Sequence, residues 1–157
     1  MSPLRPRLAL FQPVIPQNVG ACIRLSACFG VELHVIEPVG FRFDDAGMKR
    51  AALDYGPLGH MTRHADWDAF QRARAPGRLV LFTTRGAAPL DAFAFQPDDV
   101  LLFGSETAGA PEAVHAAADA RVVIPLMPDA RSLNLSVSAG IGLFEALRQS
   151  GGLASDR

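Results

Sequence analysis

Three polar clusters hold the side chains of this sequence that could do chemistry. Asn18 and Arg24 lie in "PQNVGACIR", Glu106 lies in "FGSETAGAP", and the last apolar helical segment opens with "SLNLSVS". Amides, hydroxyls and carboxylates orient polar ligands, and a guanidinium is suited to phosphate. Each residue also has a plain structural interpretation: Asn18 as a helix N-cap, Arg24 in a surface salt bridge, Glu106 as an exposed loop acid.

The entrance of the last helical segment contains more small polar residues than a cap requires. One or two such residues are enough to cap a helix. The four found here are Ser132, Asn134, Ser136 and Ser138. Free backbone N–H groups at a helix N-terminus bind anions and carboxylates well. We therefore expect a polar group to lie against this entrance.

The elements that must position these clusters alternate along the chain. Short apolar runs predict buried strands of a mostly parallel sheet at residues 7–13, 32–38, 78–84, 99–106 and 120–126. Helices are predicted at residues 18–30, 44–56, 66–77, 110–120 and 132–149. The alternation indicates a single α/β domain over residues 1–157, with helices flanking the sheet and residues 152–157 as a loose tail.

Three of the predicted strands end in loops rich in glycine, proline and hydroxyl groups, namely "FTTRG", "FGSETAGAP" and "IPLMPDARSLN". Ligands of such sheets bind at the carboxyl ends of the strands, so these loops are expected to form the site. The glycine motifs of dinucleotide-binding folds and P-loops are missing, as is the nucleophile elbow of α/β-hydrolases. His60 and His64 would share a helix face but lack further ligands, so no metal site is predicted, and His34 and His115 are interpreted as structural.

Composition narrows the class of protein further. The chain of 157 residues is 49% hydrophobic and 20% charged, with a formal net charge of −1, so any RNA site must be a local cluster of arginines. Cys22 and Cys28 are interpreted as reduced core cysteines. The sequence has neither a signal peptide nor a long apolar run, so we expect a cytoplasmic protein that does not enter membranes.

Taken together, "PQNVGACIRL", "LLFGSETAGAP" and "IPLMPDARSLNLSVSAGIGLFEALRQ" resemble the three motifs of the SpoU/TrmH group of the SPOUT superfamily. The resemblance covers about residues 7–150, and it is strongest to the short enzymes that methylate the wobble nucleotide of tRNA, a cytidine or uridine. It implies an α/β fold with a deep C-terminal trefoil knot. It also implies an S-adenosyl-L-methionine-dependent ribose 2′-O-methyltransferase that releases S-adenosyl-L-homocysteine and uses no metal.

The resemblance also assigns individual residues. The family's active-site positions are occupied by Arg24, Asn18, Glu106 and Asn134. Its cofactor-binding positions are occupied by Phe82, Thr83, Gly104, Ile124, Leu126, Ser132 and Leu133. The second motif departs from the family pattern, because Ala108 and Ala110 replace residues that are often Arg and Leu. That change removes a possible contact to RNA phosphate.

In the family the site lies at a homodimer interface, with Arg24 facing the cofactor of the other subunit. A guanidinium is a poor base at neutral pH, so we expect Arg24 to bind the substrate phosphate and the 2′-OH rather than to remove the proton. Two alternatives stay open. The chain could methylate rRNA or another tRNA nucleotide, or it could be a non-catalytic module that binds RNA or the cofactor.

Overall fold

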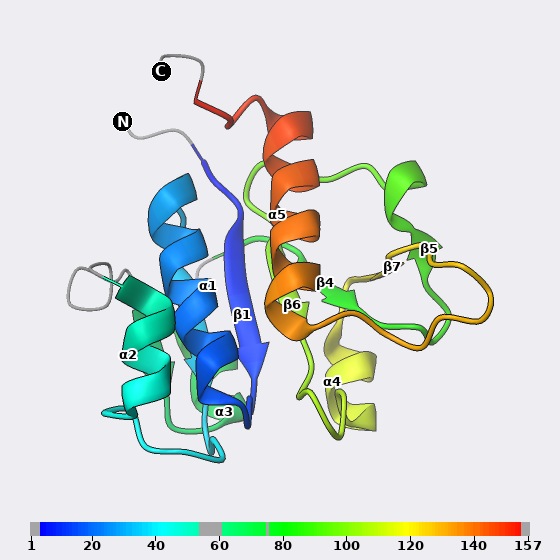
Figure 1. Cartoon of the computed structure of the whole chain (residues 1–157). Coiled ribbons are helices and arrows are strands. Elements are labelled where there is room, and N and C mark those ends of the chain that lie inside the picture. Colours follow the sequence, from blue (N-terminus) through cyan, green and yellow to red (C-terminus); the bar gives the residue numbers. More distant parts are fainter. Residues whose placement is uncertain (1–3, 54–60, 75, 155–157) are drawn as a thin grey trace.

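A seven-stranded parallel sheet forms the centre of the molecule (Figure 1). This computed structural model describes residues 4–53, 61–74 and 76–154. The strand order is β3-β2-β1-β6-β4-β7-β5, and every neighbouring pair is parallel. The strands are β1 (Arg7–Phe11), β2 (Leu33–Ile36), β3 (Met61–His64), β4 (Leu79–Phe82), β5 (Ala88–Pro89), β6 (Val100–Phe103) and β7 (Ala120–Val123). The predicted α/β class is confirmed.

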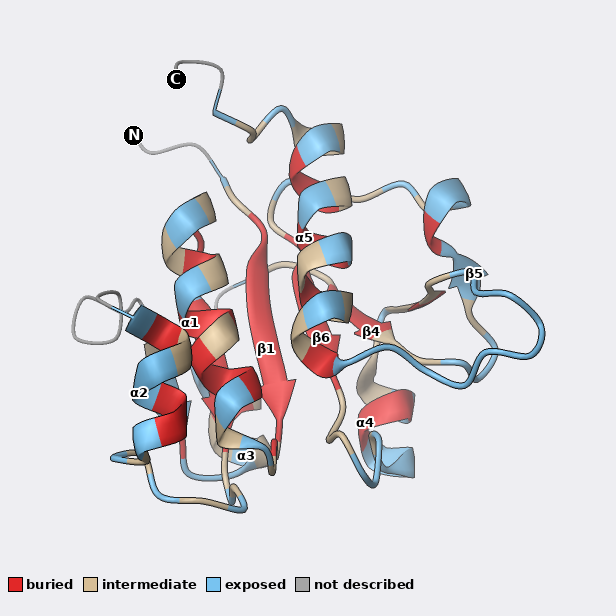
Figure 2. Cartoon of the chain, viewed as in Figure 1, coloured by how far each residue is buried: buried red, intermediate tan, exposed pale blue. Residues whose placement is uncertain are grey.

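Helices cover both faces of the sheet. They are α1 (Pro16–Phe29), α2 (Ala46–Ala52), α3 (Trp67–Ala73), α4 (Glu112–Ala117) and α5 (Leu135–Ser150), with a short 3₁₀ helix at Leu90–Ala92. Helices α1, α2 and α5 lie on one face, with α3 and α4 behind the sheet (Figure 1). Figure 2 shows that these helices turn buried residues toward the sheet and exposed residues outward.

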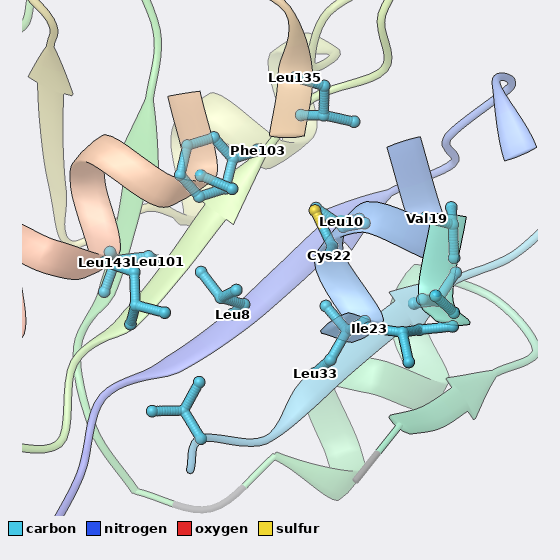
Figure 3. Close-up of a cluster of buried hydrophobic side chains, with 14 of the residues drawn as sticks. Leu8, Leu10, Val19, Cys22, Ile23, Leu33, Leu101, Phe103, Leu135 and Leu143 are labelled. Atoms are coloured by element: carbon cyan, nitrogen blue, oxygen red, sulfur yellow. The ribbon is translucent and has the colours of Figure 1, made fainter. Parts of the chain in front are cut away.

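The hydrophobic core is divided by the sheet, because successive side chains of a strand point to opposite faces. Leu8 and Leu10 of β1 pack with α1 and α5, whereas Ala9 and Phe11 pack with Phe70 of α3. Figure 3 shows the first of these clusters, in which Cys22 of α1 lies among leucines from β1 and β2. Both faces of the central strands are therefore anchored, and the loops at their ends have a rigid base.

All five predicted strands are present, and two were missed. Both missed strands lie at the edges of the sheet. Three of the four residues of β3 are not fully buried, and β5 is two exposed residues long. An edge strand packs on fewer neighbours and needs no continuous apolar run, so the sequence carries little signal for it.

The helix entrances differ from the predicted ones. Helix α1 begins at Pro16 with Ile15 at the N-cap position, so Asn18 lies inside the helix and does not cap it. Helix α5 begins at Leu135 and is capped by Asn134, so the residues before Asn134 belong to the preceding loop. Helix α4 begins at Glu112 with Pro111 at the N-cap position, later than the predicted start at residue 110. The predicted helix 44–56 ends at Ala52, and its residues from 54 onward lie outside the described part of the chain.

Two further expectations need correction. Cys22 is buried as predicted, and burial raises the pKa of its thiol to about 12, but Cys28 is exposed and is not a core residue. The tail is not loose from residue 152 onward, because the Gly152 N–H donates to the Leu147 carbonyl and Leu153 packs on the core; residues 155–157 lie outside the described part. In the described ranges, no helix has the length and apolarity needed to cross a membrane.

Candidate functional site

The three loops identified in the sequence converge on one cavity of about 490 Å³ at the carboxyl ends of β4, β6 and β7. All seven predicted cofactor-binding residues line it, together with Asn18, Glu106 and Asn134. Of the predicted site residues, Arg24 alone is outside this lining. The segment from residue 124 to 134 loops out past β5 before it returns to α5 (Figure 1), and both of its ends contribute to the cavity wall.

Glu106 fastens the β6 loop to the entrance of α1. Its Oε1 accepts a hydrogen bond from the Val14 N–H at 2.8 Å, and its Oε2 accepts one from the Ile15 N–H at 2.9 Å. The same Oε2 accepts a third bond from Asn18 Nδ2 at 3.2 Å. A carboxylate beside a helix N-terminus is also favoured by the helix dipole. Glu106 is therefore not a free loop acid. Both of its carboxylate oxygens accept hydrogen bonds that hold the first and second motifs together.

Asn134 accounts for part of the polar entrance of α5, because it caps this helix. Its Oδ1 accepts hydrogen bonds from the N–H groups of Ser136 at 2.9 Å and Val137 at 3.3 Å, and from Ser136 Oγ at 2.6 Å. These backbone groups are thus already satisfied, so the expected open anion site at this helix end is not present. Ser132 and Ser138 instead line the cavity. The entrance is polar because it caps the helix and forms a wall of the cavity at once.

Gly104 is required by the close packing of its own loop. A Cβ atom at this position would lie 2.5 Å from the Gly109 carbonyl carbon and 2.6 Å from the Ala110 nitrogen. Gly109 itself has a φ of 67°, which favours glycine, and its backbone pairs with that of Ser105. The two glycines let the "GSETAG" turn fold back tightly beside the cavity.

Arg24 lies apart from the cavity, on the exposed surface of α1. Within the described ranges it forms no ion pair, so the surface salt bridge considered for it is not found. Gly20, one turn earlier, is buried, and a Cβ there would lie 2.1 Å from the Met48 carbonyl oxygen. This glycine therefore serves the packing of α1 on α2.

The cavity also has lining residues that the sequence reasoning did not assign. Thr84 extends the β4 loop, and Arg131 extends the loop before α5. Arg131 lies in "PDARSLN", directly before the assigned Ser132, so a charged residue in a predicted ligand loop was the signal. An exposed guanidinium at the cavity wall can meet an anionic group of a ligand.

The histidines are arranged differently from the prediction. His64 belongs to β3 rather than to a helix, and His60 lies outside the described residues. His64 stacks on His34 of β2, and its Nε2 lies 2.9 Å from His34 Nδ1, while His34 Nε2 lies 3.0 Å from Glu32 Oε1. Burial lowers the pKa of both histidines. In the ranges that the structure describes, no three His, Cys, Asp or Glu side chains are grouped to hold a metal.

A second, open groove of about 800 Å³ runs along the outer side of α5. Val137, Ile141 and Phe144 line it, with exposed fractions of 48%, 39% and 48%. Phe144 also makes an edge contact with Phe29 at the end of α1, so the outer surfaces of α1 and α5 are continuous. Ile124 lines both the groove and the cavity, and every other lining residue belongs to one of the two, so they are separate features.

Known proteins resemble this chain over nearly its whole length. The "SpoU rRNA Methylase family" matches residues 5–144. A tRNA (cytidine(34)-2′-O)-methyltransferase of Beijerinckia indica is 53% identical and covers 94% of this chain and 93% of its own length. The enzyme of the same name from Escherichia coli is 44% identical, covering 92% of this chain and 93% of its own.

Two solved structures support the same grouping. One, which concerns 2′-OH methylation of cytidine or uridine 34 on tRNA, has a TM-score of 0.88 and 41% identity, covering 94% of this chain and 97% of its own. The other is the SpoU methyltransferase AviRb of Streptomyces viridochromogenes in complex with S-adenosylmethionine, with a TM-score of 0.82 and 27% identity; it covers 95% of this chain and 62% of its own. The chain therefore belongs to the SpoU methylase family.

Proposed function

We propose that this chain is an S-adenosyl-L-methionine-dependent tRNA ribose 2′-O-methyltransferase that modifies the wobble nucleotide, cytidine or uridine 34. The observation that carries the proposal is the convergence of three family motifs on one cavity at the carboxyl ends of the strands. Relatives named for methylation of cytidine 34 share 44% to 54% of their residues with it over most of the chain.

The cavity suits the proposed cofactor in size and lining. Its volume of about 490 Å³ lies within the range of small-molecule sites, and its walls combine apolar side chains with a few polar groups. Ile124, Leu126 and Leu133 would pack on the adenine and ribose, while Ser132 and Thr83 would supply hydrogen bonds. When bound, S-adenosyl-L-methionine supplies an electrophilic methyl group on a sulfonium. The remaining task of the protein is to position a ribose 2′-OH.

The polar residues of the three motifs divide this task. Glu106 holds Asn18 and the loop before α1 in place through its three hydrogen bonds. Asn134 orders the start of α5 beside the cavity. Arg24, free of any ion pair within the described residues, would bind the substrate phosphate and its 2′-OH. The proton of the 2′-OH then leaves to water or a phosphate oxygen.

In a homodimer, Arg24 of one subunit would lie near the cavity of the other subunit, because Arg24 does not line the cavity of its own chain. Arg24 and the exposed apolar residues Val137, Ile141 and Phe144 lie on the adjacent helices α1 and α5. A two-fold symmetric contact through these helices would bury the apolar groove and place the arginine of one subunit near the cavity of the other. A formal net charge of −1 also makes convergence of arginines from two subunits useful for holding RNA.

The finer features implied by the family belong to the same proposal. We expect the described sheet and helices to be parts of one domain spanning residues 1–157. We also expect the segment around the loop before α5 to be threaded as a deep trefoil knot, and the enzyme to act in the cytoplasm without a metal.

Site-specific mapping of 2′-O-methyl groups in RNA from cells with and without the gene tests the substrate. The proposal expects a methyl group at tRNA nucleotide 34 to disappear on deletion and to return with the wild-type gene. Loss at a different tRNA position or in rRNA would identify another substrate. Deletion of the gene could also leave the methylation pattern unchanged. If the purified protein then binds no S-adenosyl-L-homocysteine, the chain is a non-catalytic module.

A further inference from the structure

His115 is a buried side chain that the proposed chemistry does not use. It lies in α4 with 3% of its surface exposed, and it is not among the residues that line the cavity. Both ring nitrogens have partners: Nδ1 lies 3.2 Å from the Pro111 carbonyl oxygen, and Nε2 lies 2.9 Å from Thr83 Oγ1. Thr83 itself lines the cavity. The ring is therefore in direct contact with a residue of the cofactor site.

The polarity of these two hydrogen bonds follows from their partners. A carbonyl oxygen can only accept, so Nδ1 must carry the proton. In a neutral ring Nε2 then has only a lone pair, and the Thr83 hydroxyl must donate to it. The single hydroxyl proton of Thr83 is thereby committed to His115, and one Thr83 lone pair accepts from the Arg85 N–H at 3.3 Å. The lone pair that remains can only accept a hydrogen bond.

The contact with Pro111 does not by itself explain the histidine. The Pro111 carbonyl already accepts from the N–H groups of Val114 at 3.0 Å and His115 at 3.1 Å. An apolar ring at position 115 would leave that carbonyl satisfied. What the imidazole adds is a fixed acceptor for Thr83, while the Nδ1 contact selects the tautomer.

We propose that His115 is a positioning residue of the cofactor site. It turns the proton of Thr83 away from the cavity, so that the hydroxyl accepts a hydrogen bond from an N–H or O–H donor of the nucleoside part of the bound cofactor. Much of the cavity wall nearby is apolar, with Phe82, Ile124 and Leu126 among its residues, so one oriented acceptor contributes strongly to ligand selectivity. The inference rests on the proposed cofactor site.

Calorimetric binding of S-adenosylhomocysteine and of three analogues tests this role. Each analogue lacks one donor: the adenine amino group (S-inosylhomocysteine), the 2′-OH or the 3′-OH. The wild type should bind one analogue about tenfold more weakly than the parent, because a buried acceptor loses its donor. Thr83→Val should abolish that penalty. His115→Phe should also reduce it, because the freed hydroxyl can turn and donate.

The controls separate positioning from a structural role. His115→Gln offers Thr83 an amide oxygen and should keep the analogue penalty, whereas His115→Asn is too short and should lose it even if His115→Phe does not fold. Adding His115→Asn to Thr83→Val should change selectivity no further. An undiminished penalty in folded His115→Asn or His115→Phe, or a wild type that penalises none of the three analogues, would overturn the inference. A wild type that does not bind S-adenosylhomocysteine at all would instead contradict the proposed function.

Discussion

The cavity and the outer surface of α1 and α5 are built in opposite ways. The cavity is closed by hydrogen bonds within one chain: Glu106 fastens the loop before α1, and Asn134 caps α5. The outer surface has an arginine without an ion pair in the described residues, and exposed apolar side chains such as Ile141 and Phe144. On the proposed function, we expect one chain to hold the cofactor and a second subunit to complete the site for the RNA.

The largest expected effect comes from breaking the outer surface. Phe144→Glu places a charge in the apolar groove of α5 and, by symmetry, acts twice in a two-fold dimer. A hot-spot loss of about 2 kcal/mol per copy would weaken dimerisation about 10³-fold. Light scattering should then report a monomer that has lost methyl transfer but still binds S-adenosylhomocysteine. Leu53→Glu, at another exposed apolar position, is the matched control and should stay dimeric. An active monomer would contradict this use of the surface.

Arg24→Ala should separate the two regions within a single variant. Methyl transfer should fall about 10²- to 10³-fold, because a positioned charge-assisted contact to the substrate is lost. The dissociation constant for S-adenosylhomocysteine should stay within about twofold, since binding-site contacts are unchanged. Arg24→Lys should rescue little, because it lacks the planar fork. Arg72→Ala, on the opposite layer of the molecule, controls for the loss of one positive charge. Loss of cofactor binding in Arg24→Ala would reassign the residue.

The sequence predicted most of the residues that line the cavity but few of the hydrogen bonds that hold its loops together. Loops that follow buried strands can be recognised by their glycine, proline and hydroxyl residues. A parallel sheet places these loops together, because the carboxyl ends of its strands lie at one edge. Hydrogen bonds between distant segments leave no such pattern: the Glu106 contacts to Val14 and Ile15 join residues about 90 positions apart. The N-cap interpretation of Asn18 is wrong for this reason, since its partner Glu106 lies in another motif. Edge strand β3 and the pairing of His34 with His64 were missed because both depend on which strands become neighbours.

Glu106→Gln should loosen the cavity side of the comparison. A glutamine keeps one acceptor oxygen, but its NH₂ group replaces the other. That NH₂ group would face N–H donors, which now lack an acceptor. We expect the free energy of unfolding in urea to fall by about 1–2 kcal/mol, with weaker binding of S-adenosylhomocysteine. Glu112→Gln removes an exposed carboxylate that pairs with Arg85 and should leave both measurements unchanged. Equal behaviour of the two variants would mean that Glu106 fastens nothing.

The smallest expected effect involves the buried histidine pair His34 and His64, which lies away from the cavity and from the outer surface of α1 and α5. His34 and His64 pack against Phe70, and burial lowers the pKa of each. At His34, Glu32 opposes this lowering of the pKa and Arg7 adds to it. At His64, the neighbouring His34 lowers the pKa further. Because the unfolded chain takes up protons below about pH 6.5 and the native pair resists them, stability should be full above that pH and decline as the pH falls through it. The melting temperature should fall between about pH 7.5 and about pH 5.5, and it should fall less steeply in His64→Phe. Identical slopes would exclude the pair as the cause.

The most direct test of the account is a mixed dimer that joins two defective chains. One chain carries Arg24→Ala with an intact cavity. The other keeps Arg24 but carries Leu133→Trp, which fills the cavity from a position that is 37% exposed and so tolerates the larger ring. The two chains are co-expressed with different tags, and tRNA methylation is measured on the purified mixed dimer. If Arg24 serves the cavity of the other subunit, one site is whole, and about half of the wild-type rate should return. A mixed dimer as inactive as either parent would show that each chain uses its own arginine, and the shared site would be wrong.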